Sequence, residues 1–540
     1  MKKRVLALLV AMAFTAGIVG CGEQATTSEV KTQSSEIVKE ESKTEVKEEK
    51  KDPVTLEWYY AGNGMQQDTQ KVEDYVNELL KEYEGLEHVT LHLNCFTAAE
   101  YKDKVLLAQT SGKQIDLLQT YRLDYNTEVT NGTFLAMDDY LAMDEYAELK
   151  STIPSWLWDQ VARNGSIYVV PVYQIGATTA YFAIPDKYLE YVDVNEDAVR
   201  GFDINDVKSV TAYCDEIERI TLAVREKENT KTKYCFPIAQ SIAKFGDFFP
   251  KDVLDSNSGF MLIHGGDEVC NIYLSDAYKE ACRISAKWVE EGLLPSDATV
   301  RDDSLWQNQN ILAAESYAVQ PTQYYGEEER VSEIVSGNWG VDVTTYAMYD
   351  QYFFRANWGA GGTGITSACK NPDEAMKLID ALNTEKGKEI YNALVYGLEG
   401  VHYEKIDENH IKTLEYDATM GSADTTYAGW NWVLGNTSYG YLNQGYRDDE
   451  MEVVNAINNS TDALSSILMG GFLLDLNPVS TEVAQCTAVV TEYHKTLAYG
   501  AKGADWEAYY NEFIAKMETA GVQKVLDYMQ EQVDAFLSTK

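Results

Sequence analysis

Residues 54–60 read Val-Thr-Leu-Glu-Trp-Tyr-Tyr and begin the region whose pattern decides the fold. Alternation and β-branched residues predict a strand here, and Gly62-Asn63-Gly64 ends it. Helical and strand patterns then alternate along the chain, at residues 68–83 (helix), 89–96 (strand), 101–109 (helix) and 115–118 (strand). Such alternation predicts an α/β fold with a mainly parallel sheet covered by helices.

Upstream of this region, the first residues have the pattern of a secretion signal. Lys2, Lys3 and Arg4 precede an apolar run from Val5 to Val19, which is too short for a permanent spanning helix. The ending Ile18-Val19-Gly20-Cys21 resembles a bacterial lipobox, in which the signal is removed and the cysteine becomes lipidated. We therefore expect residues 1–20 to be a signal peptide and Cys21 to carry acyl chains such as palmitate. The alternative is an ordinary signal peptide with a chance cysteine.

Residues 21–53 link this signal to the folded region. Ser, Thr, Glu and Lys dominate the segment, and large apolar groups are almost absent. Such a composition predicts a disordered linker. Its typical reach is about 30 Å, and charge would extend it. A folded body could therefore stand clear of the membrane while it stays tethered.

Composition excludes several functions. The 540 residues carry a formal net charge of −41, and loss of the signal would take it to −44. Such a surface repels phosphate backbones, so we expect no nucleic-acid binding. Seven cysteines remain beyond Cys21 without a CxxC pair, which favours buried, reduced thiols over a disulfide framework. The 37 tyrosines and 10 tryptophans favour the recognition of sugar faces.

Short motifs for nucleotide, metal or covalent chemistry are incomplete or lie in the wrong structural context. Residues 359–364 match GxGxxG, but no helix follows directly. His88 and His92 lie on a predicted strand, about 13 Å apart. The run from Asp193 to Ile204 lacks the glycine and the final glutamate of a calcium loop. Ser241 to Lys244 matches SxxK without its companion motifs. We predict no catalytic residues, no metal site and no cofactor.

The second half of the chain is rich in helix signals. Asn371 is a predicted N-cap, with Pro372 at the first helical position. Apolar residues repeat every three to four positions across 506–517 and again across 522–536. Gly521 separates these two stretches as a predicted cap. We therefore expect a helix-rich carboxyl terminus.

Several stretches together resemble a known family. Residues 371–380 (NPDEAMKLID) and 392–403 (NALVYGLEGVHY) are similar to extracellular solute-binding lipoproteins of ABC sugar importers, family 1-like. More narrowly, they resemble the LipO-like subgroup with a carboxyl-terminal domain of unknown function. Further agreeing stretches lie at 104–116, 132–141, 287–293 and 471–482. The similarity covers essentially all of residues 54–540.

The resemblance implies a two-lobed, periplasmic-binding-protein-like fold of type II, with a hinge between the lobes. Lobe one would comprise residues 54–173 plus 345–398. Lobe two would comprise 176–340 plus 402–540, including the helical carboxyl-terminal region. The chain would cross between the lobes near 172–174, near 341–350 and around 397–401.

Ligand contacts are expected at strand ends and loops that face the cleft. Sugar sites combine aromatic faces with amides that bind hydroxyls. On that chemistry we predict ten ligand-binding residues: Tyr60, Asn63, Tyr121, Tyr173, Gln323, Tyr324, Trp358, Trp430, Trp432 and Asn436. An arginine in the cleft, at Arg122 or Arg355, would instead favour a uronic-acid sugar.

The leading hypothesis is a monomeric, lipid-anchored receptor that captures an oligosaccharide and delivers it to the permease subunits of an ABC importer. It would be held outside the cytoplasm at the cell membrane, most simply on a Gram-positive surface. Peptide or another polar solute is the alternative cargo. A surface glycoside hydrolase is a third hypothesis, and it would need two carboxylates in one cleft.

Overall fold

The computed structural model describes residues 51–539 apart from 245–247, 264–266, 296, 300–315, 355–360, 415–425, 461–465, 468–471 and 473. The predicted signal peptide and most of the linker therefore lie outside the described residues. Within the described part, no helix is long and apolar enough to cross a membrane. Residues 52–540 form a single compact unit.

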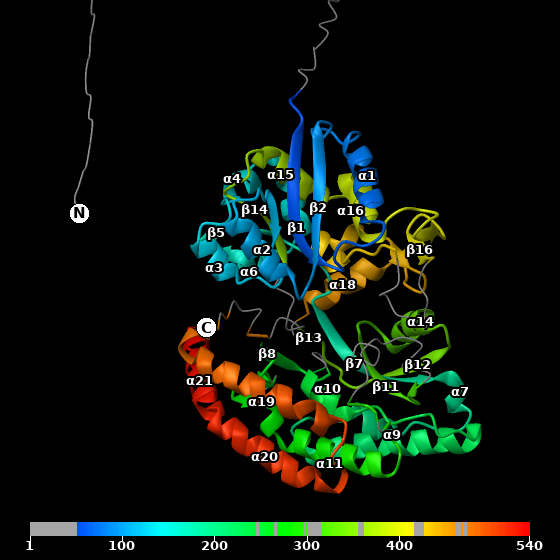
Figure 1. The fold of residues 1–540 in the computed structure, drawn as a ribbon. Coiled ribbons are helices and arrows are strands. Elements are labelled where there is room, and N and C mark those ends of the chain that lie inside the picture. The colour runs from blue at the N-terminus through cyan, green and yellow to red at the C-terminus, as the bar shows by residue number, and fades with distance from the viewer. Residues whose placement is uncertain are drawn as a thin grey trace, which may run out of the picture. The chain divides into compact units, whose positions relative to one another are not determined.

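The first lobe is built on a five-stranded sheet (Figure 1). Its strand order is β2 (Val89–Thr97), β1 (Val54–Gly62), β3 (Leu117–Gln119), β14 (Gly362–Ile365) and β6 (Val170–Pro171). Strand β1 pairs in parallel with β2 and β3, as the sequence predicts. The glycine-rich β14 instead runs antiparallel to β3 and β6, so the sheet is mixed.

Helices cover this sheet and complete the first core. The predicted helices are confirmed as α1 (Thr69–Leu80), α2 (Tyr101–Thr110), α4 (Asp138–Leu141) and α15 (Pro372–Ala381). The other elements of this lobe are α3 (Tyr125–Thr130), α5 (Ala147–Thr152), α6 (Ser155–Val161), β4 (Ala162–Arg163), β5 (Ser166–Ile167), α16 (Lys388–Tyr396), β15 (Tyr403–Lys405), β16 (His410–Thr413), α17 (Asn431–Leu434), β17 (Leu442–Asn443) and α18 (Glu450–Asn458).

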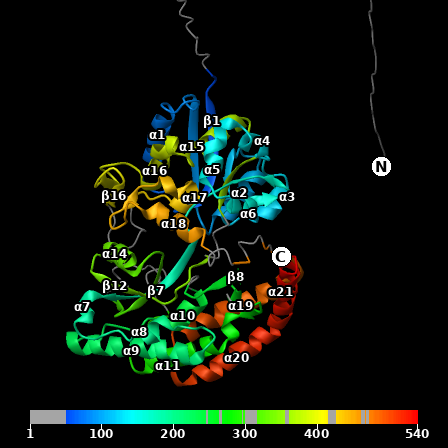
Figure 2. The same ribbon diagram turned by 180° about the vertical axis from the view of Figure 1, so that it is seen from behind.

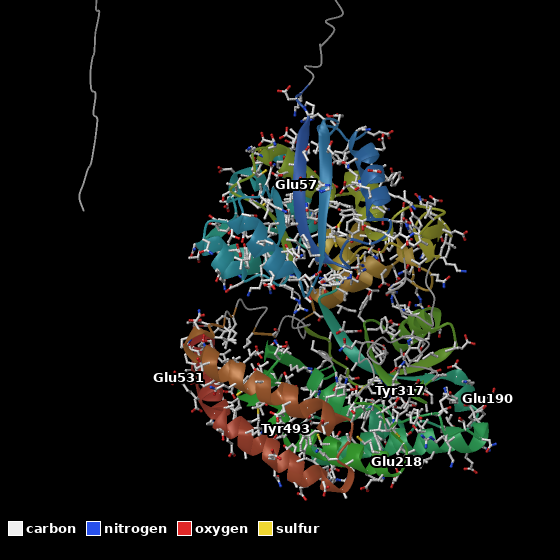
Figure 3. All side chains as sticks on the ribbon, viewed as in Figure 1. Glu57, Glu190, Glu218, Tyr317, Tyr493 and Glu531 are labelled. Atoms are coloured by element: carbon white, nitrogen blue, oxygen red, sulfur yellow. The ribbon has the colours of Figure 1, made fainter. Side chains whose placement is uncertain are left out.

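The second lobe has antiparallel sheets and long helices. In one sheet β7 (Ala177–Pro185) lies between β11 (Gln320–Tyr324) and β12 (Val343–Ala347), and β13 (Phe353–Phe354) pairs with its start. The other elements of this lobe are α7 (Asp186–Leu189), α8 (Glu196–Arg200), α9 (Val207–Glu228), α10 (Ile238–Lys244), β8 (Lys251–Asp255), β9 (Phe260–Ile263), β10 (Val269–Asn271), α11 (Asp276–Glu290) and α14 (Glu328–Trp339). Tyr317 is buried inside this lobe (Figure 3).

The carboxyl-terminal helices pack against the second core. Helices α19 (Ser480–Ala498), α20 (Trp506–Thr519) and α21 (Val522–Leu537) lie along one side of this lobe (Figures 1 and 2). His494 of α19 bridges Tyr278 of α11, at 2.9 Å from its Nδ1, and Gln240 of α10, at 2.7 Å from its Nε2. These buried polar bonds fix α19 on the lobe. The predicted helical carboxyl terminus is confirmed.

The two hydrophobic cores correct the lobe boundaries expected from the resemblance. Strand β12 belongs to the second lobe and Met348 packs in its core, so residues 345–349 lie with lobe two. Tyr427, Val433, Leu434, Val454 and Ile457 pack in the first core. Residues 427–458 therefore lie with lobe one rather than lobe two. The expected crossing at 397–401 is also wrong, because the His402 ring lies beside Asp68 of lobe one, 3.3 Å away.

The connections between the lobes lie close together. Strand β7 begins in the first core at Ala177 and continues into the second. Beside it, β13 pairs with Ala177 and Thr178. The Asn458 side chain accepts from the backbone N–H of Gly176, at 2.8 Å, and donates to the carbonyl of Gln174, at 2.9 Å. After Asn458 the chain reaches Ser466, which hydrogen-bonds Asp252 of lobe two. Strand β7, strand β13 and the segment at Asn458 together form the hinge region.

Candidate ligand-binding pocket between the lobes

A pocket of about 470 Å³ lies beside the hinge. Its walls come from both lobes: the hinge strand and β11 supply one side, and residues 431–454 with Tyr396 supply the other. The lining residues are Gln174, Ile175, Thr178, Gln323, Tyr324, Tyr325, Tyr396, Asn431, Trp432, Thr437, Tyr441, Leu442, Asn443, Tyr446, Glu450, Met451 and Val454. A ligand held here would contact both lobes at once.

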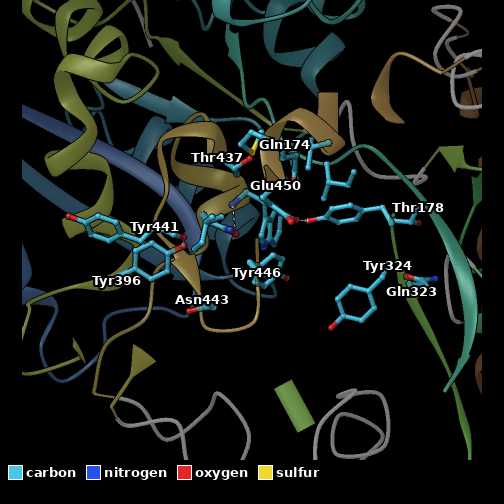
Figure 4. A pocket seen from close by; sticks show the side chains of 17 residues that line it. Gln174, Thr178, Gln323, Tyr324, Tyr396, Thr437, Tyr441, Asn443, Tyr446 and Glu450 are labelled. Carbon is cyan, nitrogen blue, oxygen red and sulfur yellow. Dashed lines mark hydrogen bonds between the residues drawn. The ribbon is translucent and has the colours of Figure 1, made fainter. Parts of the chain in front are cut away.

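Tyrosine dominates the lining. In Figure 4, Tyr396 and Tyr441 lie on one side, Tyr324 and Gln323 on the other, and Tyr446 lies between them. The Tyr396 hydroxyl donates to the carbonyl of Tyr441 at 2.7 Å, and the Asn338 amide donates to the Tyr324 hydroxyl at 2.8 Å. Burial raises the pKa of Tyr396 and of Tyr446 well above the usual range. These phenols are therefore neutral and keep their hydrogen-bond donors at physiological pH.

The lining carries little free charge. Among the described lining residues, Glu450 is the one ionisable acid or base other than the tyrosines. Its Oε1 accepts from the Tyr325 hydroxyl, and its Oε2 accepts from the Arg330 guanidinium. Both Glu450 and Arg330 are only 3% exposed. The acid is thus compensated by a buried arginine, and the pocket suits an uncharged polar ligand.

One buried hydroxyl in the lining lacks a protein partner. Thr178 is 3% exposed, and its Oγ1 has no hydrogen-bond partner among the described residues. A buried hydroxyl without a partner costs free energy. Because Thr178 lines the pocket, a ligand hydroxyl could satisfy it. This feature, like the tyrosines, favours a ligand with several hydroxyl groups.

Three of the ten predicted site residues line this pocket, namely Gln323, Tyr324 and Trp432. Gln323 and Tyr324 lie at the end of β11, and Trp432 is the second residue of the short helix α17. The prediction of ligand contacts at these positions rested on aromatic and amide residues next to a strand end or in a glycine-rich loop. The pocket brings these two distant stretches together across the interlobe space.

Three other predicted residues gather next to Trp432. Trp430 stacks on Trp432 with ring centroids 4.8 Å apart, and Tyr121 meets Trp432 edge-on at 4.9 Å. Asn63 accepts from the Trp430 indole N–H at 2.8 Å. We call Asn63, Tyr121, Trp430 and Trp432 the Trp430 cluster. Arg122 packs over the Tyr121 ring at 4.8 Å and does not line the pocket, so it does not mark a site for an acidic sugar there.

The remaining predicted residues lie elsewhere. Tyr60 is buried because the second half of β1 is covered on both faces. Tyr173 is buried and hydrogen-bonds Asn455. Asn436 is buried, and its Oδ1 accepts from the backbone of Ser438 at 3.0 Å. Trp358 and Arg355 lie outside the described residues.

Sequence reasoning missed most of the tyrosines that line the pocket. Tyr325 follows the end of β11 and Tyr441 follows Gly440 in the aromatic loop, but neither was chosen. Tyr396 and Tyr446 had neither signal, although Tyr396 lies within a stretch that carries the family resemblance. For Tyr446, the density of tyrosine and asparagine across 431–446 was the available sign. Glu450 was missed because its helix was assigned to the other lobe.

The alternative chemistries find no support in the described part of the chain. His88 lies 3.2 Å from Glu374 and His92 lies 3.1 Å from Glu73, so their side chains have separate partners. The described residues contain no group of three or more His, Cys, Asp or Glu that could hold a metal ion. All seven described cysteines are free thiols. The end of the glycine run is strand β14, and no helix begins before Pro372.

Comparisons with known proteins agree with this architecture. Residues 468–538 match the domain of unknown function DUF3502. The whole chain is 24% identical to a carbohydrate ABC transporter substrate-binding protein of Streptococcus pneumoniae and covers 99% of it.

Solved structures give the same fold. The N-glycan transport solute binding protein NgtS from Streptococcus pneumoniae aligns with a TM-score of 0.68 at 21% identity, over 90% of this chain and 99% of that chain. Its complex with Man5GlcNAc aligns with a TM-score of 0.61 at 21% identity, over 91% of this chain and 99% of that chain. The chain therefore has the two-lobed fold of solute-binding proteins and is similar along its whole length to a substrate-binding protein of a carbohydrate ABC transporter.

Proposed function

We propose that this chain is the substrate-binding component of an ABC importer and captures an oligosaccharide in the pocket between its lobes. The observation that carries the proposal is the lining of that pocket. Five tyrosines and a tryptophan surround the space with threonine, glutamine and asparagine side chains. Aromatic faces match the C–H-rich faces of sugar rings, and neutral hydroxyls and amides match their hydroxyl groups.

The relatives support the same cargo class. The similar protein in Streptococcus pneumoniae is a carbohydrate transporter component, and one solved relative was crystallised with Man5GlcNAc. Lobe closure would sequester the sugar, and the permease would then recognise the closed form. A mannose-containing N-glycan fragment is accordingly the first ligand to test.

The pocket chemistry also supports a binding role without covalent chemistry. Hydrolysis of a glycosidic bond requires two carboxylates about 5–10 Å apart. The described lining holds one carboxylate, Glu450, and its oxygens are engaged by Tyr325 and Arg330. That arrangement leaves no second acid for a glycosidase mechanism among these residues.

A peptide or another polar solute is the alternative cargo. Peptide termini would call for a free cation and a free anion in the site, because burial of an unpaired charge is costly. The described lining offers neither, since Glu450 is paired with Arg330. Neutral hydroxylated ligands are therefore the better match.

The attachment to the membrane is part of the proposal. Cys21 would carry the lipid anchor, and residues 21–53 would tether a monomeric body at the outer face of the membrane near its permease. Cys21→Ala should leave the ligand affinity of the purified protein unchanged while the protein is released from cells and uptake falls. Cell fractionation and a binding titration measure the two effects. An affinity loss in the unlipidated protein would contradict the independence of anchor and binding body.

Titration calorimetry of the purified residues 52–540 tests the function. The panel is Man1GlcNAc, Man5GlcNAc, neutral plant and host oligosaccharides, an acidic oligosaccharide and short peptides. We expect saturable binding of at least one neutral oligosaccharide and no binding of the peptides. Binding of peptides alone would favour the alternative cargo, and no binding to any glycan would contradict the proposal.

A further inference from the structure

Helix α14 meets a pocket-lining segment of the opposite lobe along one helical face. The contacting positions are 330, 333, 334 and 337, which lie on one side of an α-helix. The facing segment is 442–450, which contains β17 and the first residue of α18. Helix α14 packs with β7 and β12 of lobe two, whereas α18 packs in the core of lobe one.

Three polar contacts join the two surfaces. Arg330 donates to Asp449 at 2.6 Å and to the buried Glu450. Arg447 donates to Glu333 at 2.7 Å. Within lobe two, Asn338 donates to the hydroxyl of Tyr324 on β11, which lines the pocket. Arg330, Glu333, Asn338 and Arg447 do not line the pocket themselves. Arg330 and Asn338 contact residues that do, namely Glu450 and Tyr324.

Gly337 allows the two surfaces to touch. A glycine inside a helix costs free energy relative to alanine, so its presence calls for a reason. A Cβ at Gly337 would lie 3.2 Å from the carbonyl oxygen of Gln444 and 3.7 Å from the Cα of Gly445. Any side chain longer than a methyl group would therefore push segment 442–450 away from α14.

We propose that this face of α14 is a latch that engages segment 442–450 when the lobes close. Segment 442–450 contributes Leu442, Asn443, Tyr446 and Glu450 to the pocket lining, so the latch and the ligand share one segment. Arg330 and Asn338 are positioning residues, because they hold Glu450 and Tyr324 in place. A ligand that contacts segment 442–450 would stabilise the engaged latch, and the latch would slow ligand release. The identity of the ligand rests on the proposed function. The latch itself predicts that the lobes also close in the unliganded protein.

Gly337→Leu is the first test, with Ala515→Leu on the exposed face of α20 as the matched control. Small-angle X-ray scattering of the unliganded proteins should give a larger radius of gyration for Gly337→Leu alone. Its thermal midpoint should stay close to that of the wild type, because leucine favours a helix over glycine. Dissociation of Man5GlcNAc, measured by surface plasmon resonance, should become at least about tenfold faster when the closed state is lost.

A charge exchange provides a second test that leaves the pocket intact. Glu333→Arg places like charges opposite Arg447 and should speed dissociation about twofold to fivefold, as expected for a surface pair. The double variant Glu333→Arg/Arg447→Glu restores opposite charges and should restore the wild-type rate. A purely structural role would not show this rescue.

Two results would overturn the latch. One is an unchanged radius of gyration and dissociation rate in Gly337→Leu. The other is equal dissociation rates in Glu333→Arg, the double variant and the wild type. This second result decides the question if Gly337→Leu does not fold. If the wild type binds no glycan, the proposed function fails, while the scattering comparison still decides whether the latch controls closure.

Discussion

The pocket and the Trp430 cluster are two aromatic regions that share Trp432 yet differ in how their rings are used. In the cluster, Trp430 stacks on Trp432, and Tyr121 meets both rings edge-on. Asn63 accepts a hydrogen bond from the indole N–H of Trp430. In the pocket, Tyr324, Tyr441 and Tyr446 border an open volume of about 470 Å³. In the cluster the rings pack on one another, whereas in the pocket they border open space beside Thr178, whose Oγ1 has no partner among the described residues.

The difference shows that aromatic content alone does not mark a binding site. A side chain whose face and polar atom are already engaged contributes to stability. A side chain that borders open space is available to a ligand. In the pocket, such side chains lie beside Thr178, whose Oγ1 has no partner among the described residues. The comparison therefore predicts that substitutions in the two regions separate binding from stability.

The largest effect on affinity is expected at Tyr446, which lies between the two walls of the pocket. Tyr446→Ala removes an aromatic face from the pocket lining and should weaken oligosaccharide binding about tenfold to a hundredfold, by analogy with aromatic anchors in other interfaces. Tyr446→Phe is the matched control and separates the ring from the hydroxyl. Titration calorimetry measures both. An affinity for Tyr446→Ala within twofold of the wild type would remove the contrast between the regions.

A smaller effect is expected at Thr178. Thr178→Val removes the Oγ1 that lacks a protein partner but keeps the shape of the side chain. Loss of one hydrogen bond to the ligand should weaken binding about threefold to tenfold. The unliganded protein should be as stable as the wild type or more so, because a buried unsatisfied hydroxyl is gone. Thermal unfolding and calorimetry give the two numbers, and a lower stability with unchanged affinity would contradict the assignment.

The smallest effect on affinity is expected in the Trp430 cluster. Trp430→Ala removes one stacked pair and one hydrogen bond, which should lower the free energy of unfolding by about 1–3 kcal/mol. Oligosaccharide affinity should change by less than about twofold, because Trp430 does not line the pocket. Chemical denaturation measures the stability. A large loss of affinity with unchanged stability would place the cluster in the binding site and erase the comparison.

The sequence predicted the regular part of lobe one well. The alternation across residues 54–118 reports local periodicity, and β1, β2, β3, α1 and α2 appear where that periodicity places them. The helix at Pro372 and the two helices around Gly521 also follow from local signals. The family resemblance supplied the two lobes, which no periodicity could have given.

The pocket could not be predicted as well, because it depends on tertiary contacts. Tyr60 was chosen at a strand end, but a strand covered on both faces gives no exposed side there. Residues 427–458 were assigned to lobe two, since nothing local shows that Val433 and Val454 pack in the first core. Tyr396 and Tyr446 are 50 positions apart in the sequence, and only the fold brings both to the pocket.

A crystal structure of the protein with a bound oligosaccharide, starting with Man5GlcNAc, tests the central claim most directly. The account predicts sugar rings between the lobes, against Tyr441 and Tyr446, with a sugar hydroxyl at Thr178 Oγ1. Sugar bound only at the Trp430 cluster, or outside the interlobe pocket, would contradict it.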